Sequence, residues 1–208
     1  MLDQECERLD PRIRRTRQLL QDALRHLLEE KEFDKISVQD ITEAATLNRA
    51  TFYAHYSDKF ALLEESIRVG FWQLLKQRNV QFDGTCPAAF KAIILAVCDY
   101  LIQSQTNLSG KQHQFEPFMQ ATVIHQIQLG LLEGFRHHPV ERRVAPETIA
   151  ATASWAIYGA AKQWVNSESS ARLPQEEFAS LAVELVQPIL MAGAEAPAVL
   201  PAAQHSLQ

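Results

Sequence analysis

The chain has 208 residues, of which 47% are hydrophobic and 22% are charged, with 7 Gly and 9 Pro. This is the composition of a folded globular chain, and it excludes a disordered or collagen-like one. The net charge of −5 argues by itself against bulk affinity for nucleic acid, but residues 11–60 carry nine basic against eight acidic side chains and form the only positive segment.

The cysteines and the first ten residues indicate a compartment. Cys6, Cys86 and Cys98 make an odd number without a Cys-x-x-Cys pair, which fits a reducing environment and gives no zinc framework. The first ten residues are acidic, unlike a signal peptide, and no apolar run reaches the ~20 residues that span a bilayer. We therefore expect a cytoplasmic protein without a membrane segment.

Apolar residues recur at i, i+3 and i+4 along the chain, and strand signals are nearly absent, so the predicted fold class is all-α. The first helix is expected over about 11–32. Ser37 caps a short second helix, with Asp40 in the reciprocal position of a capping box. After an interruption at 46–48, a third helix is expected over about 49–56, and Ser57 caps a fourth that ends near Arg78.

A breaker cluster at 79–87 separates these helices from a second helical group. Further helices are expected over about 88–104, 116–135 and 146–166. The last begins at Pro174 and is kinked by Pro188. The predicted domains are residues 1–56 and a helical bundle over residues 57–193, followed by a disordered tail at 194–208.

The second and third helices, with the tight turn between them, form a helix-turn-helix, whose second helix lies in the major groove of DNA. Phe52 and Tyr56 are four residues apart and are expected to anchor that helix to the core, while Thr51, Tyr53 and His55 stay exposed. Four arginines within six residues can also follow a phosphate backbone, or form an ordinary solvated helix start: Arg12, Arg14, Arg15 and Arg17.

The segment resembles the tetracycline-repressor-like (TetR) family of transcriptional regulators. The resemblance rests on Ile41-Thr42-Glu43-Ala44-Ala45, on the run from Leu47 to Tyr56, and on Lys59 with Leu62-Leu63 after it, and it covers about residues 12–63. The family usually has Gly in the turn where this chain has Thr46. Since Gly relieves a left-handed backbone that would strain a β-branched residue, we expect the turn to follow another path.

The resemblance implies a role for each matching residue in DNA binding. Arg49 is the expected base reader, because its guanidinium can pair bidentately with guanine. Ala50 is expected to touch a thymine methyl group, and Gln39 to add a contact from the second helix. The residues implied to bind phosphates are Thr51, Tyr53, His55 and Lys59.

The resemblance also implies a homodimer through the last two long helices, which reads a palindromic operator, represses transcription and is released by an unknown small-molecule effector. Small residues such as Ala153, Ala156 and Ala160 would let a partner helix approach closely. Aromatic and polar side chains could line the effector pocket or belong to an ordinary core: Tyr100, Phe115, Phe118, Met119, His125, Trp155 and Tyr158.

Other functions have less support in the sequence. No catalytic motif is present, so the chain is not expected to be an enzyme. His113, Glu116 and His125 lack the spacing of a metal site, and no cofactor is expected. A helical ligand carrier or interaction module with weak or no DNA binding is the remaining alternative, which a flat salt dependence of DNA affinity would favour.

Overall fold

The computed structural model describes residues 10–78, 87–107, 115–137, 143–168 and 170–192. These residues form eight α-helices and one short 3-10 helix, and contain no strand, which confirms the all-α prediction. The predicted tail, together with Cys6, Cys86 and His113, lies outside the described residues.

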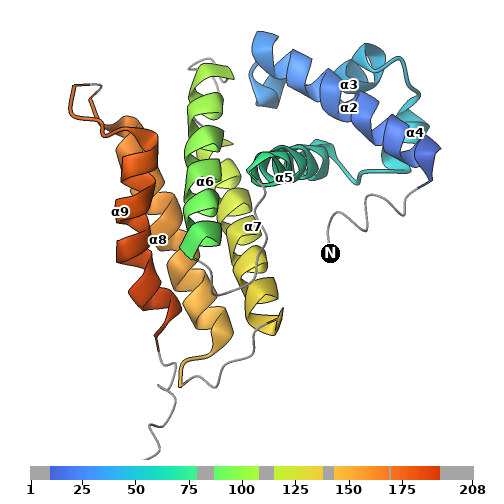
Figure 1. The fold of residues 1–208 in the computed structure, drawn as a ribbon. Helices are drawn as coiled ribbons and strands as arrows, with labels where there is room; N and C mark the ends of the chain where they lie inside the picture. The colour runs from blue at the N-terminus through green and yellow to red at the C-terminus, as the bar shows by residue number, and fades with distance from the viewer. Residues whose placement is uncertain (1–9, 79–86, 108–114, 138–142, 169, 193–208) are drawn as a thin grey trace, which may run out of the picture.

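Three helices form the N-terminal group. The helix α2 (Pro11–Glu30) begins after Asp10, whose side chain accepts a hydrogen bond from the Arg12 backbone N–H at 2.8 Å, and a stripe around Leu20 and Leu24 is fully buried. The 3-10 helix η1 (Phe33–Lys35) leads to α3 (Val38–Ala44) and α4 (Arg49–Tyr53). The core of this group therefore lies where α2 packs against α3 and against the helix that begins at Lys59 (Figure 1).

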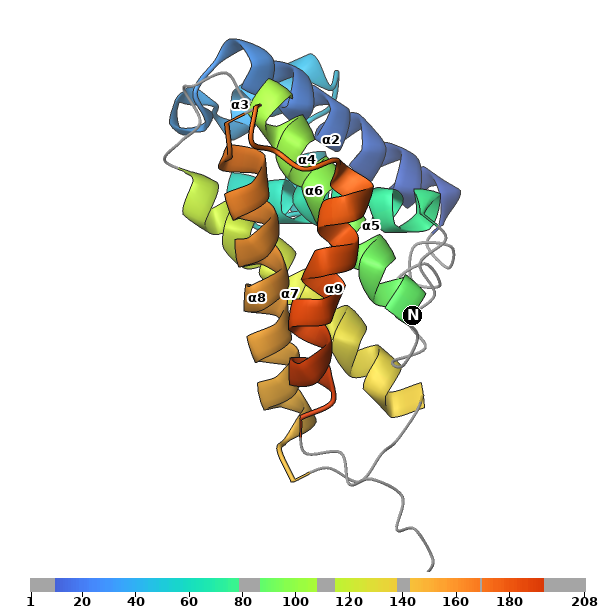
Figure 2. The ribbon, with the colours of Figure 1, turned by 60° about the vertical axis from the view of Figure 1, so that its left-hand side comes forward.

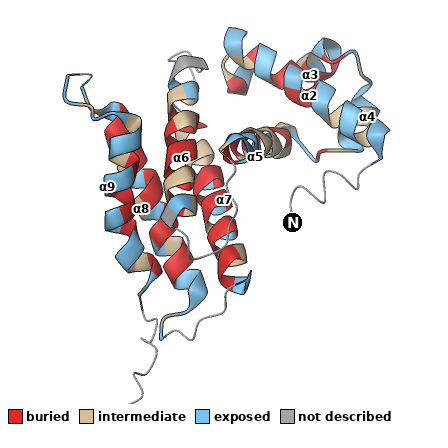
Figure 3. Ribbon diagram, in the orientation of Figure 1, coloured by how far each residue is buried: buried red, intermediate tan, exposed pale blue. Residues whose placement is uncertain are grey.

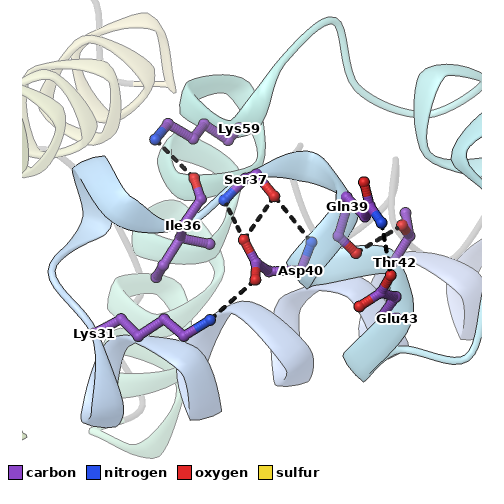
Figure 4. Close-up of polar contacts among 8 residues, drawn as sticks. All are labelled: Lys31, Ile36, Ser37, Gln39, Asp40, Thr42, Glu43 and Lys59. Atoms are coloured by element: carbon purple, nitrogen blue, oxygen red, sulfur yellow. Dashed lines mark hydrogen bonds and ion pairs between the residues drawn. The ribbon is translucent and has the colours of Figure 1, made fainter.

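The predicted capping box at the start of α3 is confirmed. The Ser37 hydroxyl accepts from the Asp40 N–H at 3.1 Å, and the Asp40 carboxylate accepts from the Ser37 N–H at 2.8 Å (Figure 4). Lys31 donates to the same carboxylate at 2.9 Å. The hydrogen bonds from Ser37 and Lys31 hold the pKa of Asp40 well below its usual range.

The long helix α5 (Lys59–Gln77) lies between the N-terminal group and the remaining helices (Figure 1). It packs against α2 on one side and against α6 (Pro87–Asn107) and α7 (Glu116–His137) on the other. Its N-cap is Asp58, which accepts from the N–H groups of Phe60 and Ala61 at 2.9 Å each, so the prediction of Ser57 as the cap was wrong by one residue.

The other two helices are α8 (Pro146–Asn166) and α9 (Gln175–Leu190), which lie side by side on the far side of α6 and α7 from α2–α4 (Figures 1 and 2). The buried residues of α6–α9 face one another, whereas α8 and α9 also present an exposed outer face (Figure 3). The bounds predicted for α8 agree with the structure, and Pro188 lies inside α9 as expected.

Candidate nucleic-acid interface

The helix α4 is held in place by a cap and by two inward aromatic side chains. The Asn48 side chain accepts a hydrogen bond from the Ala50 N–H at 2.9 Å. Phe52 is fully buried, Tyr56 is 7% exposed, and their ring centroids are 5.9 Å apart. The prediction that these two residues anchor the helix is confirmed. The helix itself ends at Tyr53 rather than near Tyr56.

The turn between α3 and α4 is a Schellman motif with Thr46 in the position that glycine usually takes. The Leu47 N–H donates to the Thr42 carbonyl at 2.9 Å, and the Thr46 N–H donates to the Glu43 carbonyl at 3.1 Å. Thr46 has a φ of 54°, in the left-handed region. The expectation of a different path was therefore wrong: the two hydrogen bonds keep the turn in its usual form despite the strain on a β-branched residue.

Several predicted contact residues lie together on the outside of this motif. Arg49 and Ala50 are exposed, and Tyr53 is 52% exposed. Thr51 and His55 are half-buried. No hydrogen bond or ion pair joins the side chains of Arg49 and Tyr53 to another described residue, so their donors are available to a ligand.

Gln39 on α3 and His55, which follows the end of α4, have neighbours that affect their hydrogen-bond donors. Gln39 is exposed at the start of α3, where its amide nitrogen donates to Glu43 at 2.9 Å (Figure 4). Burial, and then the positive charge of Arg17, lower the pKa of His55 from its usual value near 6.5. His55 is therefore a neutral imidazole at pH 7 and can still donate one N–H.

Lys59 has partners other than the phosphate that the resemblance implies. Its ammonium nitrogen donates to the carbonyl oxygens of Phe33 and Ile36, each at 2.8 Å, and of Asp34 at 3.2 Å. Figure 4 shows the contact with Ile36. It also lies 4.6 Å from the centre of the Phe33 ring. Because an ammonium group has three N–H donors, these carbonyls account for all of them. Lys59 joins the start of α5 to the end of η1.

The residues expected to line an effector pocket separate into two groups. Tyr100 on α6 and Tyr158 on α8 are buried, and Phe118 and Met119 on α7 are half-buried against the core. Burial raises the pKa of Tyr158 to about 12 and that of Tyr100 further. By contrast, Trp155 is 57% exposed on the outer face of α8, and His125 is exposed on α7, so these two do not face the interior.

The sequence reading missed a buried polar pair between α5 and α7. The indole N–H of Trp72 donates to the side-chain oxygen of Gln126 at 3.0 Å, and Gln126 is only 3% exposed. A glutamine at a position where the helix pattern calls for an apolar residue was the available signal. This pair connects α5 directly to the bundle.

A second missed cluster holds the other end of α5. The Arg78 guanidinium donates to Asp99 on α6 at 2.6 Å, and Gln175 at the start of α9 donates to the other oxygen of the same carboxylate at 2.8 Å. The hydrogen bond to Asp99 raises the pKa of Arg78 above its usual value. With Lys59 at one end and Arg78 at the other, α5 is attached to both parts of the molecule.

The helix-turn-helix geometry agrees with a comparison against known families. The family model described as bacterial regulatory proteins, tetR family, matches residues 20–66, which run from the middle of α2 into α5. Residues 20–66 are therefore a segment of the tetR type. This confirms the resemblance found in the sequence. The chain's relatives are regulators and not enzymes, as predicted.

One curated relative is similar to this chain in sequence, and solved structures are similar to it in fold. YxbF of Bacillus subtilis (strain 168), an uncharacterized HTH-type transcriptional regulator, is 41% identical over 63 residues, which are 30% of this chain and 17% of YxbF. The dihydroxyacetone kinase operon activator DhaS is similar over 86% of this chain and 98% of its own, with a TM-score of 0.54 and 17% identity. A TetR transcriptional regulator from Streptococcus agalactiae 2603V is similar over 84% and 95%, with a TM-score of 0.53 and 22% identity. The two structures share the fold.

The described residues contain neither a membrane-spanning helix nor a cluster of metal ligands. No helix among them is long and apolar enough to cross a membrane. Within the same residues, no group of three or more His, Cys, Asp or Glu side chains could hold a metal ion.

Proposed function

We propose that this chain is a DNA-binding transcriptional repressor that reads a palindromic operator as a homodimer and releases it when a small-molecule effector binds. Residues 1–56 form the DNA-binding domain, and residues 57–193 bind the effector and the second subunit. The observation that carries the proposal is α4, a short helix anchored by Phe52 and Tyr56. It presents the side chains of Arg49 and Tyr53, which have no hydrogen-bond partner among the described residues.

In this proposal the exposed residues divide into base and phosphate contacts. Arg49 pairs with guanine for about 1–3 kcal/mol of discrimination, and Ala50 touches a thymine methyl group. Gln39 adds a contact from the start of α3. The phosphates are bound by Thr51, Tyr53 and His55. Lys59 is assigned to holding η1 against α5, because its three donors already bind carbonyls.

The dimer is proposed to form through the outer face of α8 and α9. Trp155 on α8 is 57% exposed and Leu185 on α9 is 72% exposed. Both are large apolar side chains, and a second copy of the chain would remove them from contact with water. Leu181 lies one turn before Leu185, and the exposed Gly159 lies one turn after Trp155. Large and small residues on the same face allow close packing with a second copy, which gives a four-helix interface.

The effector is proposed to bind inside the bundle and to act through α5. Tyr100 and Tyr158 provide buried hydroxyl groups, and the pair of Trp72 and Gln126 lies where α5 meets α7. A ligand that takes the hydrogen bond of Gln126 would change how α5 sits on α7. Because Lys59 ties α5 to η1, the shift reaches α3 and α4 and alters the spacing of the two recognition helices.

The test begins with selection of bound sequences from random duplexes, which supplies an operator. Arg49→Ala should reduce the preference for the selected duplex over a random one by about 5- to 150-fold, the equivalent of 1–3 kcal/mol. Tyr53→Phe is the matched comparison on the same helix, because it removes one phosphate donor and should weaken both duplexes equally. Equal effects of Arg49→Ala on both duplexes would refute its assignment as a base reader. No binding to any duplex at low salt would favour the ligand carrier.

A further inference from the structure

The first turns of α2 carry three arginines whose side chains have no partner among the described residues. Arg12, Arg14 and Arg15 are exposed, and no hydrogen bond or ion pair joins their side chains to another described residue. Farther along α2, Arg25 donates to Asp22 at 2.8 Å. The same helix therefore contains one arginine that is paired with Asp22 and three exposed arginines that are unpaired among the described residues.

The positive charges of these three arginines destabilise the start of α2. The N-terminal end of a helix has a partial positive charge, so each basic side chain there costs a few tenths of a kcal/mol. The first turn of α2 contains no acidic residue to balance them, and the carboxylate of Asp10 is already used as the N-cap. An anion from outside the chain would relieve this repulsion.

Arg17 places this end of α2 next to the end of the recognition helix. Its guanidinium carbon lies 5.8 Å from the centre of the Tyr56 ring, and its positive charge lowers the pKa of His55. Its Nε atom is buried without a hydrogen-bond partner among the described residues, and the nearest carboxylate, that of Glu65, is 3.9 Å from another of its nitrogens. Arg14 lies one turn earlier on the same side of α2.

We propose that Arg12, Arg14, Arg15 and Arg17, here called the α2 arginine patch, bind DNA phosphates outside the groove that α4 reads. The ligand class is the phosphodiester backbone of duplex DNA, contacted without regard to base sequence. The inference rests on the proposed DNA-binding function and adds a second contact surface on a different helix. Figure 1 shows the start of α2 and α4 at the same end of the N-terminal group.

The contribution of the patch can be read from the salt dependence of binding. Each neutralised phosphate adds about 0.9 to the slope of log affinity against log salt concentration. One arginine per subunit gives two contacts per dimer, so a single Arg14→Gln change should lower the slope by about 2. Replacing Arg12, Arg14 and Arg15 together should lower it by about 5 if all three make contact.

The experiment uses the full-length protein, an operator selected from random duplexes, and a random duplex of equal length. Affinity is measured over a salt series of about 50–300 mM for the wild type, for Arg14→Gln and for the combined change of Arg12, Arg14 and Arg15 to Gln. Arg25→Gln is the matched control on the same helix. The combined variant should lose at least about tenfold in affinity at 0.1 M salt on both duplexes, whereas the control should stay near wild type.

Thermal unfolding separates this loss from damage to the fold. Removing three arginines from a helix N-terminus should leave the melting temperature unchanged or slightly higher. An unchanged salt slope in the combined variant, while the wild type binds duplexes, would overturn the patch and leave the proposed function intact. An equal loss in Arg25→Gln would also overturn it, because the effect would then follow net charge. A wild type that binds no duplex would overturn both.

Discussion

Replacing Thr46 by glycine should make the protein more stable. Thr46 has a φ of 54°, where an L-residue with a Cβ atom pays about 1–2 kcal/mol. Glycine removes that cost but loses about 0.5–1 kcal/mol through the greater freedom of the unfolded chain. The threonine side chain is exposed and donates no hydrogen bond within the described residues. The expected net gain for Thr46→Gly is therefore about 0.5–1 kcal/mol.

Urea unfolding followed by circular dichroism measures this gain, at fixed protein concentration because a dimer's stability depends on it. A gain of 1 kcal/mol corresponds to roughly 2–4 °C in melting temperature for a chain of this length. Ala121→Gly is the control: Ala121 is an exposed residue within α7, away from the proposed dimer face, where glycine should cost about 1 kcal/mol. If Thr46→Gly were neutral or destabilising, the account of strain in this turn would be refuted.

Four further outcomes are expected. Asp40→Asn should cost about 1 kcal/mol at pH 7 through the capping box. Because the pKa of Asp40 is depressed in the folded state, its stabilising effect is full above about pH 4 and is lost progressively as the pH falls toward that depressed pKa. Urea unfolding should therefore show a smaller difference between wild type and variant at pH 3 than at pH 7. Leu185→Glu should convert the proposed dimer to a monomer in sedimentation experiments and weaken operator binding, whereas an unchanged dimer would place the interface elsewhere. Lys59→Met should speed hydrogen exchange in residues 33–36, since the carbonyl oxygens there lose their partner. If His55 binds a phosphate, operator affinity should rise as the pH falls below about 6.5, and His55→Gln should remove that rise.

The order of the helices and most of their starts could be predicted from the sequence, because caps and prolines act locally. Pro146 opens α8 at the expected residue, and Ser37 with Asp40 forms the expected capping box. The error at Ser57 has a simple cause. Ser57 and Asp58 are neighbours that both cap well, and only the folded backbone shows that Asp58 receives the N–H groups.

The partners of the candidate site residues were harder to predict where a long side chain can reach in two directions. Lys59 has the residue type and spacing of a phosphate contact, but its flexible chain reaches back to carbonyl oxygens 23 to 26 residues away in the sequence. Trp155 was expected near a pocket because α8 is apolar on several sides. Periodicity cannot say which apolar side meets α7 and which meets solvent or a partner subunit.

The proposed coupling between effector binding and DNA binding requires a free energy about as large as that of one hydrogen bond between α5 and α7. A tenfold loss of operator affinity requires only about 1.4 kcal/mol of coupling between effector and DNA. The hydrogen bond between Trp72 and Gln126 is worth about 0.5–1.5 kcal/mol, so an effector that replaces it in one state only acts on the right scale. The attachments at Lys59 and Arg78 involve charged groups, whose hydrogen bonds are worth about 1.5–3 kcal/mol each and would survive the shift. In the proposed mechanism, the weak contact between Trp72 and Gln126 is therefore the one that switches. Lys59 transmits the movement of α5 to η1, while Arg78 keeps the other end of α5 on α6.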